Sequence, residues 1–541
     1  MQRDVQAMAA QSYDVLVVGG GITGSCIARD AAMRGLKVAL IERRDWSSGT
    51  SSASSKLVHG GLRYLKSLEF GLIRESLAER RIWERIAPHL VRPLPFLVPF
   101  FKEGLGQRLT LRAGLTLYDW LSYDKAWLDD PEQRLPGHRM LTRAEVIARE
   151  PNLDVPGLTG ALVYYDCQMD SPERLGLECV IDAMRSGARA ANYVEALEFL
   201  RDGAKVAGVR ARDTLNGTEY QLRAQVTINA AGPWADLLLQ QMDNSPVHLM
   251  RSKGIHVIVP ALTKTHALTV QHKGKHFFVL PWRGHTILGT TDTPFQDHPD
   301  AVRPGASDID DLLRVVNEGI GFTRLTSTDV RHAYAGLRPL IDDGSSSSYN
   351  ASRKSEIVDH GDSGAPALFS VIGGKWTTSR HVAQQAVDLV QKTLKLPLTR
   401  AATSSKPLPG GNFPRRAQFR ADVDKALPHL SPEVREALTR LHGSAYADVL
   451  CHAKDDPGLL SPVSNGVSDT GAAVLHAARA EMAVTLSDVV FRRSGLGGLG
   501  HPGRAALDRA AELMARHHGW SPQQTGQQIA DVEAQFPMAA H

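Results

Sequence analysis

The feature that most constrains this chain is a glycine pattern within residues 13–43, which read YDVLVVGGGITGSCIARDAAMRGLKVALIER. A short apolar run at residues 15–18 suits a buried parallel strand, and G-x-G-x-x-G follows it at residues 19–24. Apolar residues then recur at helical spacing as far as Gly35, and a second apolar run follows at residues 38–41. This order of strand, tight turn, helix and strand predicts a Rossmann-type unit.

Such a unit suits a dinucleotide. Glycine lets the backbone come close to a pyrophosphate, and the helix N-terminus offers unpaired N–H groups with a partial positive charge. Glu42 ends the second predicted strand, where a carboxylate can accept hydrogen bonds from the adenosine ribose. Because this carboxylate would repel a 2′-phosphate, the sequence favours FAD or NAD over NADP.

A second G-x-G-x-x-G occurs at residues 495–500, in different surroundings. It follows Arg492, Arg493 and Ser494 instead of an apolar strand, and Pro502 comes soon after it. The residues about 20 positions further on include no acid that could contact a ribose. We interpret this second match as a flexible loop that connects helices.

Length and composition predict a globular chain of more than one domain. The chain has 541 residues, whereas a single core stops growing at roughly 250 to 300. Its net charge is only +4, with 62 basic and 58 acidic residues, so we expect no nucleic-acid partner. The 4 cysteines form no CxxC pair and no His/Cys spacing of a zinc or iron–sulfur site. We therefore expect reduced thiols and no metal.

The sequence predicts neither a signal peptide nor a membrane-spanning helix. Residues 1–11 lack an apolar core, and the apolar patch PLPFLVPFF at residues 93–101 is far shorter than the ~20 residues that a spanning helix needs. Residues 100–121 instead interleave Lys102, Arg108 and Arg112 with leucines and Trp120. This basic amphipathic stretch suits a membrane interface or packing on its own domain, and the sequence leaves both interpretations open.

Beyond residue 159 short alternating runs predict strands. The expected strands are residues 161–165, 190–200, 205–212, 219–222, 225–234, 256–259, 277–282 and 286–291. The tight turn at residues 283–285 joins the last two, as in an antiparallel substrate domain. The expected helices include residues 69–86, 171–185 and 378–394. The three prolines and two glycines of KPLPGGNFP, at residues 406–414, predict a domain boundary, beyond which the periodicity is helical.

Several blocks of this sequence, in order along residues 13–493, resemble the FAD-dependent (respiratory, quinone-linked) sn-glycerol-3-phosphate dehydrogenases. They are VVGGGITG at 17–24, SSASSKLVHGGLRYL at 51–65, NAAGPW at 229–234, KGIHVIVP at 253–260, GTTDTP at 289–294, AGLRPL at 335–340, GGKWTT at 373–378 and EMAVTLSDVVFRR at 481–493. The SSKLVHGGLRYL portion is far more specific than a dinucleotide fingerprint. One departure is Ser379-Arg380, where the family usually has Tyr-Arg.

The resemblance implies an α/β fold. Its core is a glutathione-reductase-type FAD-binding Rossmann fold, with an antiparallel-sheet substrate cap and a C-terminal all-α domain at 406–541. Within residues 1–405, the FAD parts would lie at about 12–90, 160–235 and 335–400, and the cap parts at about 91–159 and 236–334.

The resemblance also implies an activity and partners. The activity is oxidation of sn-glycerol 3-phosphate to dihydroxyacetone phosphate, with electrons passing through FAD to membrane quinone. The protein would lie in the cytoplasm, bound peripherally to lipid on the cytoplasmic face of the inner membrane. A homodimer is a further expectation for the assembly.

Site residues follow from the matching positions. The positions expected to hold FAD are Gly19, Gly21, Ile22, Thr23, Gly24, Glu42, Arg43, Thr50, Ser51, Ser54, Ser55, Lys56, Leu57, Gly60, Gly61, Val194, Ala231, Gly232, Gly289, Gly374, Lys375, Trp376 and Thr377. Those expected to face substrate are Arg63, Tyr64, His256, Arg338, Arg353, Lys375 and Thr378. Arginine forks match phosphate geometry, and a phosphomonoester dianion needs several converging cations.

Oxidation of a secondary alcohol also needs a base for the hydroxyl proton. His59 and His256 are the candidates, with Arg338 beside them, and the sequence does not choose between the two histidines. Each basic residue alone is more often a surface charge. Arg338 and Lys375 stand out because each is expected in a glycine-rich turn after an apolar strand.

Two other functions compete with this interpretation. A D-amino-acid or glycine oxidase of the same flavin fold would also use an arginine, but has less use for several cations or for a long helical tail. A protein that has lost FAD and binds a partner, as prenylation-related escort proteins do, is the non-enzymatic alternative. Glu42 and the intact glycine set argue against it.

Overall fold

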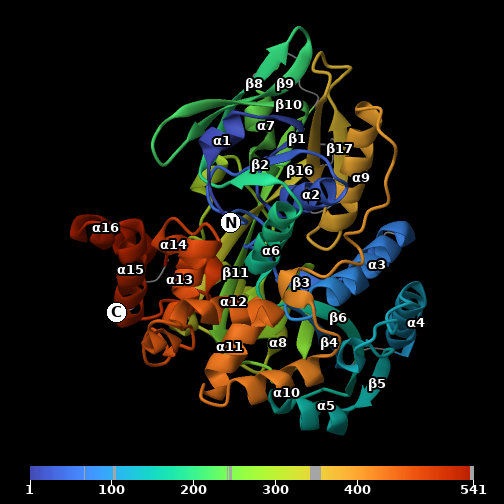
Figure 1. Cartoon of the computed structure of the whole chain (residues 1–541). Helices are drawn as coiled ribbons and strands as arrows, with labels where there is room; N and C mark the ends of the chain where they lie inside the picture. The colour runs from blue at the N-terminus through green and yellow to red at the C-terminus, as the bar shows by residue number, and fades with distance from the viewer. Residues whose placement is uncertain (66–67, 102–104, 241, 243–246, 342–354, 537–541) are drawn as a thin grey trace.

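The computed structural model describes residues 1–65, 68–101, 105–240, 242, 247–341 and 355–536, except the side chains of Arg63, Leu105 and Gln107. Two large sheets lie one above the other in Figure 1, and a group of helices flanks the lower sheet. The first sheet builds on the glycine-rich unit, the second belongs to the cap, and the helices come from the C-terminal part of the chain.

The first sheet is parallel at its centre. Its order is β17-β18-β10-β1-β2-β7, and β9 and β8 extend from β10 as an antiparallel ribbon. The strands are β1 (Ser12–Val18), β2 (Val38–Ile41), β7 (Arg189–Ala191), β8 (Val194–Asp202), β9 (Lys205–Asp213), β10 (Glu219–Asn229), β17 (Ser355–Asp359) and β18 (Leu368–Gly373). The central strands are apolar because both of their faces are covered.

Alternate residues of β1 pack on opposite faces of this sheet. Val15 and Val17 share a core with α2 (Ile22–Met33), α6 (Pro172–Arg185) and α9 (Ser379–Thr393). Leu16 and Val18 pack on the other side with α1 (Val5–Ala9) and the β8–β9 ribbon. The sheet is therefore buried on both sides, and its strand ends are the part left to form a site.

The second sheet is antiparallel apart from the parallel pair β4 and β12. Its order is β15-β11-β14-β13-β12-β4-β6-β3, with β16 on β11 and β5 on β6. The strands are β3 (Leu57–Val58), β4 (Val91–Phe100), β5 (Arg139–Thr142), β6 (Gly160–Met169), β11 (Leu249–Pro260), β12 (Ala267–His272), β13 (Lys275–Trp282), β14 (His285–Gly289), β15 (Thr293–Pro294) and β16 (His332–Ile341). Leu312 and Val316 of α8 (Ala306–Ile320) pack against β11 and β13.

Four further helices precede the C-terminal helices: α3 (Phe70–Ile86), α4 (Leu105–Leu121), α5 (Arg143–Arg149) and α7 (Ala235–Leu239). The helices expected at 69–86, 171–185 and 378–394 are confirmed as α3, α6 and α9. Ser171 caps α6 as expected, with its side chain accepting a hydrogen bond from the Arg174 N–H. The hairpin between β13 and β14 is also confirmed.

Several sequence expectations need correction. Residues 219–222 and 225–229 form one strand, β10, and residues 190–200 are split between β7 and β8 at Tyr193, whose φ is +57°. Arg338 lies inside β16 instead of in a turn. Strands β6 and β16, expected largely in the FAD part, hydrogen-bond within the cap sheet. The predicted limits between the FAD parts and the cap parts are not tested as a whole. At β6 and β16 the limits should move so that both strands belong to the cap.

The C-terminal helices pack around their own core. They are α10 (Arg416–Ala426), α11 (Pro432–His442), α12 (Tyr446–Leu450), α13 (Gly471–Ala480), α14 (Leu486–Asp488), α15 (Arg504–His518) and α16 (Pro522–Glu533). Leu438, Val474 and Leu507 are members of that core. The second glycine pattern, at 495–500, lies between the turn Val489–Arg493 and α15, so its expected place between helices is confirmed.

Buried ion pairs join these helices to the rest of the molecule. Arg493 and Arg492 both contact Asp45, which follows β2, and Arg174 of α6 contacts Glu481. These pairs explain why the 481–493 block is so rich in charge. They attach the helices directly to the glycine-rich unit.

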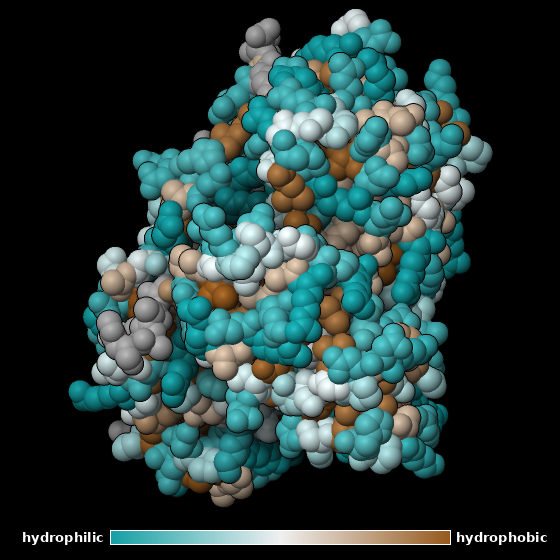
Figure 2. Space-filling model, turned by 60° about the vertical axis from the view of Figure 1, so that its left-hand side comes forward, coloured by the Kyte–Doolittle hydropathy of each residue, from teal (hydrophilic) through white to brown (hydrophobic). Residues whose placement is uncertain are grey.

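Within the described residues, the helices all lack the combination of length and apolar character that crossing a bilayer would require. The face in Figure 2 is mainly hydrophilic, and its hydrophobic residues are scattered in small groups.

Candidate active site

One cavity of about 1490 Å³ lies where the two sheets meet. Its walls include Val18, Ile41 and Ala230 at the carboxyl ends of β1, β2 and β10, together with residues of β11, β12 and β16. Ligands of open α/β sheets bind outside the carboxyl ends of the strands. The cavity is large enough for a dinucleotide and a smaller second molecule.

The first end of the cavity is a cradle for a pyrophosphate. Gly19 has φ +110°, and a Cβ there would lie 2.5 Å from the Ala230 carbonyl oxygen. A Cβ on Gly24 would lie 1.9 Å from the Gly19 carbonyl oxygen, so α2 approaches β1 closely only with glycine here. Gly21 caps α2 without a side-chain oxygen, which leaves the positive helix end facing the cavity.

Ser51 completes this cradle. Its Oγ accepts a hydrogen bond of 2.8 Å from the Ile22 N–H, and both residues line the cavity. The serine-rich loop is thereby joined to the N-terminus of α2. Backbone N–H groups and a hydroxyl meet at one point, a donor set that fits a dinucleotide phosphate.

Glu42 is fixed at the edge of the same cavity. Its two carboxylate oxygens accept hydrogen bonds from the N–H groups of Gly20, at 2.7 Å, and Arg44, at 2.8 Å. Burial raises the pKa of Glu42, although these two donors favour the charged form. Each oxygen keeps a further lone pair, so the carboxylate can still accept hydrogen bonds from ribose hydroxyls.

The turn between β18 and α9, residues 374–378, forms another part of the cavity wall. The His59 N–H donates to Thr377 Oγ1 at 3.1 Å, and the indole N–H of Trp83 donates to the Thr377 carbonyl oxygen at 3.0 Å. His59, Gly374 and Thr377 all line the cavity. Two blocks that are far apart in the sequence, at residues 51–65 and 373–378, therefore meet at one wall.

Arg338 projects from β16 into the cavity. Its guanidinium donates to Thr290 Oγ1 at 2.8 Å and to the Thr291 carbonyl oxygen at 3.0 Å. Gly254 on β11 makes room for it, because a Cβ there would lie 2.3 Å from Arg338 Nη2. Asp292 lies 3.9 Å from Arg338 Nη1. The strand pairing thus fixes the direction of the guanidinium.

His256 lies on β11, opposite Gly289 of β14. Its Nε2 is 2.8 Å from Ser55 Oγ, and its ring stacks on Tyr334 with centroids 5.0 Å apart. Burial, together with the positive charges of Arg338 and Lys56, lowers the pKa of His256 to about 3. The imidazole is therefore neutral near pH 7 and has a lone pair that can accept a proton.

Lys375 follows β18 and lines the cavity with Tyr64. Its Nζ lies 3.8 Å from the centroid of the Tyr64 ring and 3.2 Å from Ser76 Oγ. A cation over an aromatic face is held in place by the ring quadrupole. Lys375 and Arg338 thus bring two positive charges to the same cavity.

Comparison with known proteins agrees with this geometry. Residues 14–380 match a family model described as FAD dependent oxidoreductase, and residues 401–525 match the C-terminal domain of alpha-glycerophosphate oxidase. Glycerol-3-phosphate dehydrogenase of a Synechocystis strain is 34% identical, over 96% of this chain and 95% of its own. Glycerol-3-phosphate dehydrogenase 2 of Mycobacterium tuberculosis is 37% identical, over 97% and 88%.

A solved structure extends the likeness to three dimensions. The glycerol-3-phosphate dehydrogenase of Bacillus halodurans, complexed with FAD, superposes with a TM-score of 0.77 at 29% identity, covering 98% of this chain and 96% of its own. The chain belongs to the FAD-dependent glycerol-3-phosphate dehydrogenase family. Its cofactor is FAD, and the glycine cradle, the α2 N-terminus and Glu42 are the groups of this chain that fit it.

The structure brings most of the residues predicted to hold FAD to the wall of the cavity. They are Gly19, Gly21, Ile22, Thr23, Glu42, Arg43, Thr50, Ser51, Ser54, Ser55, Leu57, Gly61, Val194, Ala231, Gly232, Gly374, Lys375, Trp376 and Thr377. Of the residues predicted to face substrate or to act in catalysis, Tyr64, His59, His256, Arg338 and Lys375 also line it. Their contacts with ligands stay predictions.

A few predicted residues lie behind the wall. Gly24 packs α2 on β1, and a Cβ on Gly289 would lie 2.3 Å from His256 Cδ2, so this glycine makes room for the histidine ring. The Gly60 N–H donates to Tyr118 Oη and Asp166. Thr378 is the buried cap residue of α9.

Lys56 needs the clearest correction. Its Nζ lies 5.0 Å from the Trp282 ring centroid and 3.8 Å from Glu173, and the residue does not line the cavity. Burial lowers the pKa of Lys56. The predicted Arg353 lies outside the described residues, as does the side chain of Arg63, whose backbone is in the turn Leu62–Leu65.

The family departure at Ser379 lies away from the cavity wall. Ser379 is buried at the start of α9, where its Oγ donates to the Trp376 carbonyl oxygen at 2.8 Å. Arg380 forms a buried ion pair with Glu79. The departure therefore lies at the buried start of α9, and Ser379 is not among the residues that line the cavity.

Two features of the site were missed from sequence. Thr290, Thr291 and Asp292 line the cavity around Arg338, and the hydroxyl-rich GTTDTP block was the available signal. The cavity also has an apolar arm, lined by Phe96, Phe100, Leu111, Leu117, Val270 and Phe278. Four of these residues belong to β4 and α4, which contain the apolar patch at 93–101 and the basic amphipathic stretch at 100–121 that the sequence singled out.

Proposed function

We propose that the protein oxidises sn-glycerol 3-phosphate to dihydroxyacetone phosphate and passes the electrons through FAD to a membrane quinone. One observation carries the proposal: Arg338, Lys375 and His256 share the cavity that contains the FAD cradle. The names of the relatives in Synechocystis and Mycobacterium support the choice of substrate.

A phosphate dianion fits the charges of this site. Arg338 donates to Thr290 and pairs with Asp292 at 3.9 Å, and Lys375 lies over the Tyr64 ring, so a guanidinium and an ammonium group on the cavity wall could contact the phosphate oxygens. Arg63 and Arg353 are proposed to add to this clamp on the basis of their positions in the sequence.

FAD, when bound, supplies the acceptor for the hydride from C2 of the substrate. The chain must then take the hydroxyl proton. His256 is neutral, and Ser55 and Tyr334 fix its ring on the cavity wall. A phosphate dianion nearby would raise its pKa towards the working range. His59 lines the same cavity and remains the alternative base.

The competing functions fit less well. An amino-acid oxidase has a carboxylate to bind and less use for two cations, and it does not explain the match of residues 401–525. A protein without FAD does not explain why Gly19, Gly24 and Glu42 keep an intact cradle.

The apolar arm supports quinone as the acceptor. Its lining includes Leu111 and Leu117 of α4, the helix on which Leu109 and Trp120 are 63% and 71% exposed. A lipid-soluble acceptor needs an apolar path, and an interfacial helix needs an exposed apolar face beside basic residues. We propose that this side of the protein binds peripherally to the cytoplasmic face of the inner membrane.

The test is a substrate panel with an artificial electron acceptor and purified, flavin-loaded protein. Glycerol 3-phosphate should be oxidised well, and glycerol, glycine and D-alanine poorly. Preference for an amino acid would overturn the proposal. A quinone analogue that accepts electrons more slowly than oxygen would refute the quinone part alone.

A further inference from the structure

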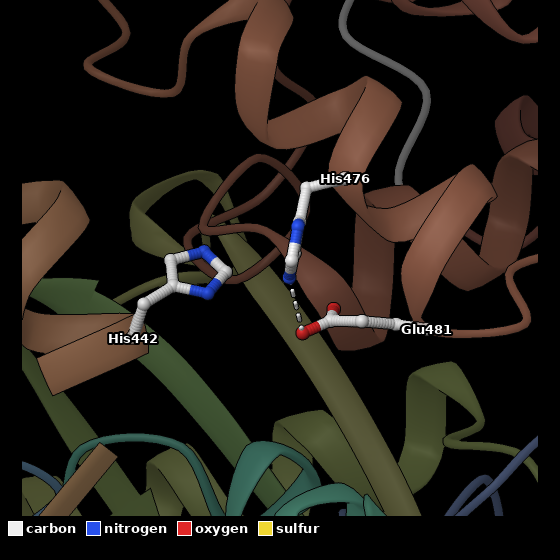
Figure 3. A group of neighbouring side chains, drawn as sticks. All are labelled: His442, His476 and Glu481. Atoms are coloured by element: carbon white, nitrogen blue, oxygen red, sulfur yellow. Dashed lines mark ion pairs between the residues drawn. The ribbon is translucent and has the colours of Figure 1, made fainter. Parts of the chain in front are cut away.

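A second group of polar side chains lies away from the FAD cavity, where the C-terminal helices meet α6. His442 ends α11, His476 lies in α13, and Glu481 follows that helix. Figure 3 shows the three side chains converging on one point from separate segments. One ligand atom from each, an imidazole nitrogen or a carboxylate oxygen, lies within 4.8 Å of the others.

This group leaves buried polar atoms without partners. His442 and Glu481 are each 1% exposed. Neither ring nitrogen of His442, nor Oε2 of Glu481, has a hydrogen-bond partner in the described part of the chain. An unpaired buried polar atom costs free energy, and one nitrogen of His442 and Oε2 of Glu481 could both be satisfied by a ligand bound between these side chains.

The types of side chain favour a transition-metal ion. Two buried carboxylates, Glu178 and Glu481, pair with Arg174, and Glu481 also interacts with the charges of Arg493 and of the N-terminal amine. His89 contacts Glu178 at 3.0 Å. Neutral imidazoles and a carboxylate are the ligands that zinc takes in proteins.

We propose that His442, His476 and Glu481 bind a divalent transition-metal ion such as Zn²⁺, with water as the fourth ligand. Ligands about 2.0–2.1 Å from zinc in a tetrahedron are about 3.4 Å from one another. His476 Nε2 and Glu481 Oε1 are already 3.3 Å apart, and because Oε1 also accepts from Arg174, the ion would bind the unpaired Oε2 of the same carboxylate. One ring nitrogen of His442 lies within 4.8 Å of the ligand atoms of His476 and Glu481.

A neighbouring histidine orients the site. His452 Nε2 lies 3.2 Å from His476 Nδ1, so a proton on Nδ1 directs the Nε2 lone pair towards the ion. A cavity of about 520 Å³, lined by His452, His476 and Glu481, provides the route of entry. Because the ligands come from α11 and α13 and Glu481 also pairs with α6, the ion would fasten the C-terminal helices to the FAD-binding part.

The test uses the untagged, flavin-loaded full chain, dialysed against a zinc buffer and analysed for metal by mass spectrometry. The proposal predicts one zinc per chain and a higher melting temperature with zinc. His442→Leu should lower zinc affinity at least about tenfold and keep the flavin. His429→Ala, at an exposed histidine of the same region, is the matched control and should bind zinc like the unaltered protein.

Two results would overturn the proposal. One is an unaltered protein that retains no stoichiometric zinc, and the other is a His442→Leu protein that binds as much zinc as the control. If His442→Leu does not fold, His476→Asn replaces it with the same expectation. His476→Asn that binds zinc with unchanged affinity would equally refute the site.

Discussion

At the residue scale, Arg338 is the side chain that best separates a phosphate substrate from others. It lies on the cavity wall, where it donates to Thr290 and Thr291 and pairs with Asp292 at 3.9 Å. Removing one charge-assisted contact costs about 1.5–3 kcal/mol. Arg338→Ala should therefore lower kcat/KM for glycerol 3-phosphate by roughly 10- to 150-fold, measured with an artificial acceptor.

The same variant should barely change the slow turnover of unphosphorylated glycerol. Arg331→Ala, at an exposed arginine next to the same strand, is the control and should keep full activity. An equal loss on both substrates would show that Arg338 acts on the reacting hydroxyl or the flavin, and would remove it from the phosphate clamp.

His256 provides a test through stability. Its pKa is lowered to about 3 in the folded protein, whereas an unfolded histidine titrates near 6.5. Between these values the unfolded state binds more protons, so stability falls as pH drops from about 6.5 towards 3. The slope from one such histidine is at most about 1.4 kcal/mol per pH unit.

Denaturant unfolding at pH 7 and pH 5 measures this effect. His256→Asn should lose less stability over that interval than the unaltered protein does. His429→Asn, at an exposed histidine, should lose as much as the unaltered protein. An unchanged loss in His256→Asn would mean that this histidine is charged in the folded state.

Single residues also show where sequence reasoning stopped. The glycine turns and Glu42 were identified because their roles depend on local order along the chain. Gly289 and Lys56 were assigned to the cofactor, but their neighbours are His256 on an adjacent strand and Trp282 of the cap sheet. Contacts between strands depend on register, which one strand's sequence does not reveal.

Among the helices and strands, α2 is the element on which FAD binding should depend most. A Cβ on Gly24 would lie 1.9 Å from the Gly19 carbonyl oxygen, so Gly24→Ala must push α2 away from β1. The flavin content of the purified variant, measured by absorbance, should fall severely. Gly526→Ala, where an added Cβ meets nothing within 4 Å, should keep its flavin. Full flavin in Gly24→Ala would mean that the cradle does not require this packing.

Helix α4 is the proposed membrane-docking surface. Reversing Arg108 and Arg112 to glutamate should weaken binding to vesicles of anionic lipid, because interfacial binding adds charge attraction to apolar burial. Co-sedimentation measures the bound fraction. Reversing Arg504 and Arg516, which are exposed on α15, changes the net charge equally and should have little effect. Equal losses in both variants would indicate a non-specific charge effect and remove α4 from the docking surface.

Most elements were predictable, and the exceptions have a physical cause. Helices α3, α6 and α9 follow from their periodicity and caps. β10 was divided into two because its first half pairs antiparallel with the β9 ribbon and its second half runs parallel to β1. The sequence therefore changes from alternating to continuously apolar without a break in the strand.

In the whole molecule, two sheets enclose one cavity, and the C-terminal helices pack beside them. The fold class followed from the blocks shared with the family, and the family models cover residues 14–380 and 401–525. The apolar arm did not follow, because β4 and α4 meet only through the packing of the cap. Because these apolar side chains line the same cavity as the FAD cradle, we propose that they contact the lipid-soluble acceptor.

The most direct measurement is the absorbance of the bound flavin, followed without oxygen. Glycerol 3-phosphate should bleach the oxidised flavin within seconds, and a short-chain quinone added afterwards should restore it. Glycerol, glycine and D-alanine should leave the flavin oxidised. A flavin that stays oxidised with glycerol 3-phosphate, or that an amino acid reduces faster, would contradict the account.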